Sequence, residues 1–341
     1  CCPARNFPSV RPQRLPESAM AKSKRLLKSI LKLLAPILIF LILAAAIAAL
    51  WLDYKVARPQ HLGYLVTPAK YGMLSSRGSQ VTDETFQGKD GVSLRAWLLR
   101  GEPNQPAVIL LHRFGADRSY VLNLGVKLNE ATNFTVFMPE QRGHGPEPGE
   151  TVCSFGGCEA EDVLSAVRFL KNLKTPEQFT LVGGGIGIYG LEMGALEALF
   201  AAEAEPEIKA LALDSVPADS NALIAAAVER RFRFASVVTG RLAQLGTYAY
   251  FYDACFNRTS ACESARNLQG RSVLLLAGSD AAKFQESTSR LSKCFQPSTR
   301  MDSKTDLSPS GMGILSASIE TSEAYDQRII DFFRSELGAL R

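Results

Sequence analysis

Apolar and polar positions along the chain alternate in blocks that predict a sheet covered by helices. Short, continuous apolar runs are typical of strands buried on both faces, and they occur at 107–111, 134–138, 210–213 and 273–277. Helical segments lie among them, at about 120–131, 159–173, 194–202 and 323–337. The segment 159–173 shows the 3.6-residue period of an amphipathic helix. This order predicts an α/β fold with a mostly parallel sheet and helices on both faces.

Two segments modify this alternation. Alternating stretches at 81–86 and 92–99 flank the turn Lys89-Asp90-Gly91, which predicts an antiparallel N-terminal edge hairpin. The segment 216–267 has a helical pattern and holds the aromatic run 248–252. We expect it to be a helical cap insertion over the carboxyl ends of the strands, where open α/β sheets bind ligands. Its aromatic residues fit either packing onto the body or a substrate wall.

A run of twenty uncharged residues, LLAPILIFLILAAAIAALWL, extends over 33–52. About 20 apolar residues cross a bilayer as one helix. A cleaved signal peptide has a shorter apolar core that ends in a small-x-small site, whereas this run ends in Leu50-Trp51-Leu52-Asp53. The pattern therefore predicts an uncleaved single-pass anchor. Positive flanking charge stays on the cytoplasmic side, so we expect 1–32 to be cytoplasmic and the remainder to lie on the periplasmic side of a bacterial inner membrane.

The predicted domain organisation follows from this anchor. A tether at 53–79, which contains His61, separates it from a domain at 80–341. Residues 1–19 are Pro- and Arg-rich without periodicity, and Met20 opens a conventional leader. We expect these nineteen residues either not to be translated or to form a disordered tail.

The net charge of +4 arises from the N-terminus. Residues 1–32 hold eight Lys or Arg and one acid, which leaves 30 basic and 33 acidic residues in the rest of the chain. A body without basic surplus has no means to hold a phosphate backbone, so nucleic-acid binding is not expected.

Five cysteines lie beyond the apolar run. Cys153 and Cys158 are close in sequence, as are Cys255 and Cys262, and Cys294 is left over. The two close pairs fit local disulfides in an oxidising compartment, although free thiols fit the spacing as well. No histidine lies near either pair, so a metal site is not expected, and nothing in the sequence indicates a cofactor.

Three local motifs resemble the α/β-hydrolase superfamily. Residues 110–115 (LLHRFG) are similar to the strand and His-Gly of the oxyanion loop, 139–145 (PEQRGHG) to the next strand end, and 190–194 (GLEMG) to the nucleophile elbow. Their order and separation, with strands before and helices after, cover about 81–337. The resemblance implies the α/β-hydrolase fold and a triad in the chain order nucleophile, acid, histidine.

Against that pattern the site is degenerate. The elbow glycines Gly190 and Gly194 are kept, but Glu192 stands in place of serine, followed by Met193. Asp280 fits the acid. The histidine would be near 310–312, yet residues 145–341 contain none. Serine chemistry depends on a base, and some relatives use an aspartate nucleophile but need a histidine-activated water. Turnover by this triad is therefore not expected.

The oxyanion loop differs as well. Arg113 follows His112 where relatives often have glycine. We expect Arg113 either to pair with the Glu192 carboxylate, because an unpaired buried carboxylate is costly, or to point to solvent. The resemblance gives His112 and His144 loop-shaping roles.

Two functions follow. The first is a membrane-anchored binding or scaffold module with a small-molecule or protein partner at the former active-site cleft and the bilayer bound through 33–52. The alternative is an active hydrolase on an ester, thioester or amide substrate with a non-standard site.

Overall fold

The structure is a computed structural model that describes residues 17–59, 63–73, 75–148, 150–232, 236–252 and 255–338. The chain forms two compact units, Cys1–Ala48 and Ala49–Arg341. Helix α1 (Glu17–Val56) begins in the first unit and ends in the second. Within the described residues it is the one helix whose length and apolar composition would suit a membrane span, over Lys32–Val56.

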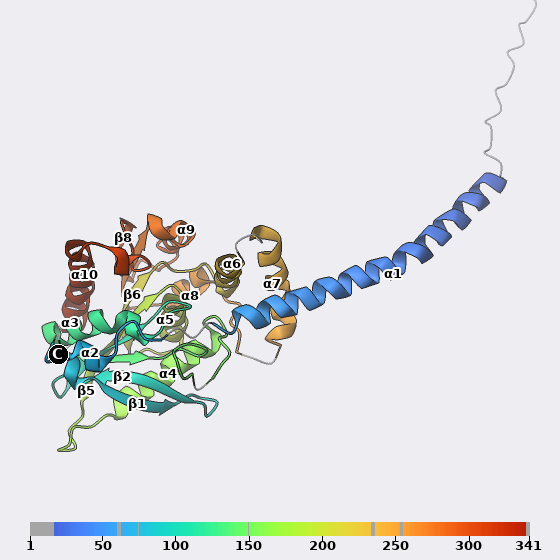
Figure 1. The fold of residues 1–341 in the computed structure, drawn as a ribbon. Coiled ribbons are helices and arrows are strands. Elements are labelled where there is room, and N and C mark those ends of the chain that lie inside the picture. Colours follow the sequence, from blue (N-terminus) through green and yellow to red (C-terminus); the bar gives the residue numbers. More distant parts are fainter. Residues whose placement is uncertain are drawn as a thin grey trace, which may run out of the picture. The chain divides into compact units, whose positions relative to one another are not determined.

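An eight-stranded sheet organises the second unit (Figure 1). Its order is β1-β2-β4-β3-β5-β6-β7-β8, antiparallel at β1–β2 and β2–β4 and parallel in the other pairs. The strands are β1 (Thr82–Gln87), β2 (Ser93–Leu99), β3 (Gln105–Leu111), β4 (Thr135–Pro139), β5 (Val182–Leu191), β6 (Ile208–Asp214), β7 (Ser272–Gly278) and β8 (Arg300–Leu307).

Helices cover both faces of this sheet, which confirms the predicted α/β architecture. Figure 1 shows α3 and α10 on one side and α4 and α5 on the other. Side chains from both faces bury completely against them, for example Ile109 and Leu211 on one face and Leu110 and Ala212 on the other. The helices of the body are α2 (Pro68–Tyr71), α3 (Leu122–Thr132), α4 (Gly157–Asn172), α5 (Met193–Ala204), α9 (Ala282–Leu291) and α10 (Ile319–Gly338), with 3₁₀ turns at Gly78–Gln80, Arg118–Val121, Ser279–Ala281 and Ile314–Ser316.

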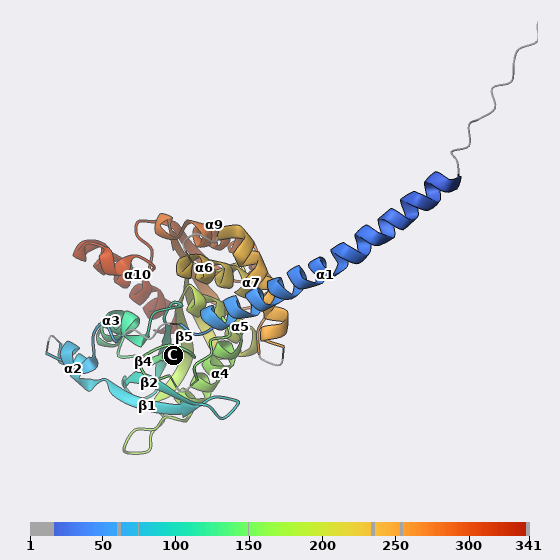
Figure 2. The same ribbon diagram turned by 45° about the vertical axis from the view of Figure 1, so that its right-hand side comes forward.

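The insertion between β6 and β7 consists of α6 (Ser220–Arg231), α7 (Ser236–Tyr250) and α8 (Ala261–Asn267). Helices α6 and α7 pack side by side (Figure 2). They bury Leu223, Ile224 and Ala243 in a third apolar cluster that also contains Val56 and Met193. The end of α1 and the start of α5 therefore share one core with the cap.

Two segments differ from the sequence prediction. The region predicted as a tether is partly structured: α1 continues to Val56, and the ring of Tyr64 packs on Trp97 with centroids 4.9 Å apart. His61 lies outside the described residues. The strand β8 had no predicted counterpart because its sequence, RMDSKTDL, is polar and its side chains are mostly exposed at the sheet edge.

Candidate functional site

The elbow between β5 and α5 holds Glu192 in a backbone conformation that residues other than glycine rarely adopt. Its backbone has φ 52° and ψ −105°, the kind of strain that persists only where the surrounding structure enforces it. A Cβ on Gly190 would lie 2.3 Å from the carbonyl oxygen of Gly194, and one on Gly194 would lie 2.6 Å from that of Leu111. Both glycines are therefore required by close backbone approach, and the sharp turn of a nucleophile elbow is present.

The Glu192 carboxylate is completely buried and held from two sides. Its Oε2 accepts a hydrogen bond from the backbone N–H of Phe114 at 3.1 Å. Its Oε1 lies 2.8 Å from the guanidinium of Arg230, on α6 of the cap. Phe114 belongs to the loop after β3, which supplies an oxyanion-hole N–H in this kind of site. A carboxylate oxygen therefore accepts the backbone N–H that, in enzymes of this fold, can donate to a developing oxyanion.

The hypothesis that Arg113 pairs with Glu192 is wrong, because Arg230 is the residue at the carboxylate. Arg113 instead lies over the ring of Tyr120, 5.3 Å from its centroid, and donates to the carbonyl of Phe114 at 3.4 Å. Its Nε is buried without a hydrogen-bond partner. The need for a cation at the buried carboxylate was inferred correctly, but the cap supplies it rather than the oxyanion loop.

Asp280 and Ser310 mark the places of the acid and the missing base. The carboxylate of Asp280 accepts hydrogen bonds from the backbone N–H and the hydroxyl of Ser310, each at 2.9 Å. Ser310 follows β8, where the triad order places the histidine. A serine hydroxyl does not accept a proton near neutral pH, so it cannot act as the general base that a nucleophile needs. Asp280, the predicted acid, is thus bonded to a residue that has no acid–base function at neutral pH.

A second buried carboxylate, Asp214 at the end of β6, lies beneath this site and had no counterpart among the predicted site residues. Tyr325, the backbone N–H of Gly311 and Ser215 all donate to it. Burial raises the pKa of Asp214, an effect opposed by these hydrogen bonds. The network fixes the loop that carries Ser310 and Gly311 to the sheet. Leu191 pairs with Asp214 across β5 and β6, which places Asp214 beside the elbow. This pairing could be inferred from the sequence only once the order of the strands was known.

The two histidines near the site shape the oxyanion loop. His144 accepts from the backbone N–H of Gly115 at 3.0 Å through Nε2, and its Nδ1 lies 2.7 Å from the carbonyl of Arg142. His112 is fully buried, with Nε2 accepting from the backbone N–H of Gln141 at 3.3 Å. These contacts match the loop-shaping roles that the resemblance implies.

Comparison with known proteins identifies the fold that carries this site. A family model described as the alpha/beta hydrolase fold matches residues 106–252. This match contains the oxyanion loop, the elbow and most of the cap. The protein has an α/β-hydrolase fold.

Solved structures with the same fold include several esterases and hydrolases. The Pyrococcus furiosus esterase Pf2001 superposes with a TM-score of 0.56 at 19% identity, covering 82% of this chain and 99% of its own. The α/β hydrolase GrgF from Penicillium sp. sh18 has a TM-score of 0.56 at 16% identity, over 76% and 99% of the two chains. Est1E from Butyrivibrio proteoclasticus, solved with ferulic acid, has a TM-score of 0.53 at 17% identity, over 74% and 98%. At these identities the likeness concerns the fold.

The disulfides of this α/β-hydrolase-fold protein differ from the local pairs inferred from spacing. Cys158 pairs with Cys255, with Cα atoms 5.0 Å apart, and Cys262 pairs with Cys294 at 5.3 Å. Cys153 is a buried free thiol beside Met193. Both bridges join segments that are distant in sequence, so the local pairing was wrong.

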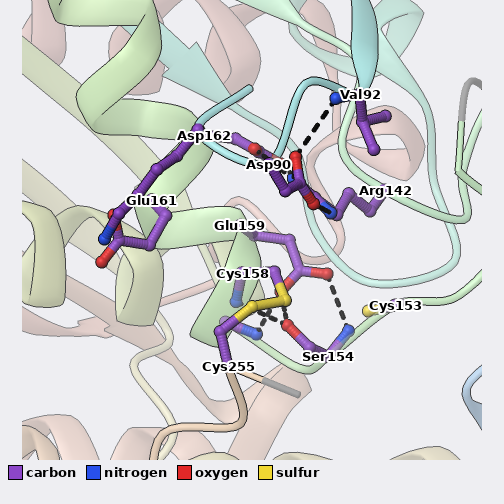
Figure 3. Close-up of a disulfide and its surroundings, with 12 residues drawn as sticks. Asp90, Val92, Arg142, Cys153, Ser154, Cys158, Glu159, Glu161, Asp162 and Cys255 are labelled. Carbon is purple, nitrogen blue, oxygen red and sulfur yellow. Dashed lines mark hydrogen bonds and ion pairs between the residues drawn. A yellow bond between two sulfur atoms is a disulfide. The ribbon is translucent and has the colours of Figure 1, made fainter. Parts of the chain in front are cut away.

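The surroundings of Cys158 explain the difference (Figure 3). Ser154 and Gly156 donate to the carboxylate of Glu159 and thereby cap the start of α4. Cys158 lies in the first turn of that helix, next to Cys255 in the segment of the cap between α7 and α8. The thiol of Cys153 points away from the bridge in the figure and contacts Met193 instead.

A cavity of about 230 Å³ remains above the buried Glu192. Its lining includes Phe114, Gly115 and Val56 together with five cationic side chains, Lys55, Arg58, Arg113, Arg230 and Arg231. A second cavity, of about 320 Å³, is lined by Arg230, Asp280 and Met312. Glu192 lines neither of these cavities, and its side chain is completely buried. Among the described residues, no group of three or more His, Cys, Asp or Glu is placed to hold a metal ion.

Proposed function

We propose that this protein is a single-pass, membrane-anchored α/β-hydrolase-fold protein that performs no hydrolysis by a Ser-His-Asp mechanism and acts as a binding module at its former active site. The observation that carries this proposal is the fixed Glu192 carboxylate. It accepts the Phe114 N–H, a donor of the kind that an acyl-transfer site directs at the developing oxyanion, and it pairs with the Arg230 guanidinium of the cap.

The residues around this carboxylate support the same function. Ser310 occupies the position of the histidine in the triad order. A nucleophile at the elbow would therefore have no side chain there to accept its proton. The open cavity above Glu192 is small and lined by side chains of one charge sign, which suits recognition of a small anionic group rather than an extended ester.

The anchor and its orientation rest on separate support. Helix α1 is long and apolar enough to cross a bilayer, and the basic leader precedes it. Two disulfides join segments of the second unit, and disulfides persist in oxidising compartments such as the periplasm. The proposed location is therefore a membrane with the C-terminal domain on the extracytoplasmic side, which fusions of the C-terminus to alkaline phosphatase and to a cytoplasm-dependent fluorescent protein would test.

Catalysis is tested on the purified full-length chain in detergent. We expect no labelling by a fluorophosphonate probe and no turnover of short-chain p-nitrophenyl esters, thioesters or amides above buffer. Turnover that disappears in Glu192→Ala, or in Asp280→Ala, would establish the alternative of an active hydrolase with a non-standard site. A matched variant, Glu203→Gln on the exposed part of α5, controls for unspecific loss.

A further inference from the structure

The cavity above Glu192 carries a large excess of positive charge. Five of its ten lining residues are Lys or Arg, and no acidic residue lines it. Among the described residues, only Arg230 of these five forms an ion pair, and its partner is the buried Glu192. Four cations therefore converge on a small volume without a carboxylate to balance them. Such a concentration of like charge is unfavourable by itself and attracts an anion.

Aromatic faces hold these cations in place without neutralising them. The guanidinium of Arg58 lies 4.2 Å from the ring centroid of Tyr54, and the ammonium of Lys55 lies 5.9 Å from that of Trp51. Arg113 is held over Tyr120. Cation–π contacts position a charge without supplying a counter-charge. One N–H of Arg58 donates to the hydroxyl of Tyr250 and one of Arg113 to the carbonyl of Phe114, and neither acceptor carries a formal negative charge. Arginine donors in this arrangement suit phosphate oxygens, which they bind with paired, charge-assisted hydrogen bonds.

The cavity lies at the end of the apolar run. Lys55 and Arg58 follow Leu52, its last residue, by three and six positions. At 1.5 Å per helical residue, Lys55 is about 5 Å along the axis from Leu52. A cation at that distance from the hydrocarbon boundary lies at the depth of lipid headgroups.

Helix α7 presents an apolar stripe beside this boundary. Val238, Leu245 and Tyr248 recur at helical spacing on one face, and Tyr252 continues that face just beyond the helix; all four are 65–85% exposed. Arg241 shares this face. On its other side α7 packs on α1, where a Cβ on Gly246 would lie 3.0 Å from the carbonyl of Ala49. An exposed stripe of this composition, on a helix that contacts Ala49, fits a helix that lies in the membrane interface.

From these observations we propose that the five-cation cavity binds the phosphate of an anionic phospholipid headgroup, while the exposed stripe of α7 rests in the interface of the same leaflet. This inference depends on the proposed function, since it names the ligand of the former active site. Charge complementarity selects an anionic lipid over a zwitterionic one. The contact of α7 with Ala49, close to the end of the apolar run, selects a lipid over a free phosphate ion.

The experiment uses the full-length chain in a neutral detergent, with thermal unfolding followed as lipid is added. We expect phosphatidylglycerol to raise the melting temperature by about 5 °C at saturation, and phosphatidylcholine or inorganic phosphate to leave it within a degree. In Lys55→Gln/Arg231→Gln, the affinity for phosphatidylglycerol should fall roughly 10–30-fold. The matched control Lys293→Gln/Arg328→Gln removes two exposed charges outside the cavity and should retain wild-type affinity.

A second pair of substitutions separates the stripe from the cavity. Leu245→Gln/Tyr252→Gln should weaken phosphatidylglycerol binding while leaving the preference for anionic over zwitterionic lipid. A phosphatidylglycerol response that is absent, matched by phosphatidylcholine, reproduced by inorganic phosphate alone, or reduced equally by the control variant would overturn the inference. Ester turnover measured on the same samples keeps the two proposals apart: turnover contradicts the proposed function, whereas the lipid response tests only the ligand.

Discussion

The Oε2 atom of Glu192 accepts a hydrogen bond from the backbone N–H of Phe114 at 3.1 Å, and Glu192 thereby places a carboxylate oxygen at a loop donor that enzymes of this fold use for a developing oxyanion. The elbow, its glycines and the loop donor are all kept. The nucleophile position has become the ligand of the oxyanion donor. This arrangement explains why the strained turn persists without a serine, since the turn still aims the side chain at Phe114.

The Glu192–Arg230 pair should stabilise the cap on the body. Arg230→Gln leaves a completely buried carboxylate without its counter-ion, a loss that costs 3–5 kcal/mol in a fully buried pair. Because the Arg230 side chain is 38% exposed, we expect about 2 kcal/mol in urea unfolding. Glu192→Gln/Arg230→Gln should recover at least half of that loss. A double variant as unstable as the sum of the single ones would contradict the pairing.

Glu192→Ser and Ser310→His together test whether the fold around the elbow can support catalysis. Glu192→Ser releases the Phe114 N–H, and Ser310→His places a base on a residue that already donates to Asp280. A positioned base contributes roughly 10²–10⁴-fold, so the double variant should hydrolyse p-nitrophenyl acetate about 10²-fold faster than either single variant. Its fluorophosphonate labelling should depend on Asp280. Equal rates in all three variants would show that the geometry at 310 does not suit a base.

The sequence was sufficient for the fold and for part of the site. Continuous apolar runs located the buried strands, and the glycines of the elbow indicated its turn, because both depend on local chemistry. The strand β8 was missed since an edge strand needs no apolar pattern. Asp280 was found because it follows an apolar strand directly.

Arg230 could not be assigned from the sequence. It lies 38 positions after Glu192 on a helix of the insertion, and the path of an insertion over the sheet depends on packing rather than on periodicity. Arg113 is adjacent to the oxyanion loop and was therefore the nearest cation in sequence. For the same reason the cysteines were paired by proximity along the chain, whereas the fold joins α4 to the segment of the cap between α7 and α8.

Peptide mapping under non-reducing conditions should identify the two long-range bridges. We expect Cys158–Cys255 and Cys262–Cys294 as linked peptides and Cys153 as a thiol that alkylates only after unfolding. The bridges span 97 and 32 residues. The chain-entropy estimate gives about 4.7 and 3.7 kcal/mol for them. Cys158→Ser/Cys255→Ser should therefore destabilise the protein by about 1 kcal/mol more than Cys262→Ser/Cys294→Ser. A peptide linking Cys153 to Cys158 would refute this connectivity.

Glu197, on α5 one turn after the elbow, should make stability fall as pH rises. It is completely buried, and neither carboxylate oxygen has a hydrogen-bond partner. Burial, reinforced by the nearby Glu159 and Asp162, raises the pKa of Glu197 well above its ordinary value. Below the unfolded-state pKa both states carry the proton. Above it, the unfolded chain releases the proton while the folded protein keeps it, so unfolding becomes more favourable by about 1.4 kcal/mol per pH unit.

Glu197→Gln removes this titration and isolates it from that of other groups. The free energy of unfolding of the variant, relative to the wild type, should increase by about 1.4 kcal/mol per pH unit from pH 5 until the folded-state pKa is reached. Glu203→Gln, an exposed position on the same helix, should follow the wild-type pH dependence. Urea unfolding of the full-length chain in detergent at pH 5, 6, 7 and 8 measures the difference. Parallel curves for wild type and Glu197→Gln would mean that Glu197 is ionised in the fold, with a counter-charge or water reaching its carboxylate.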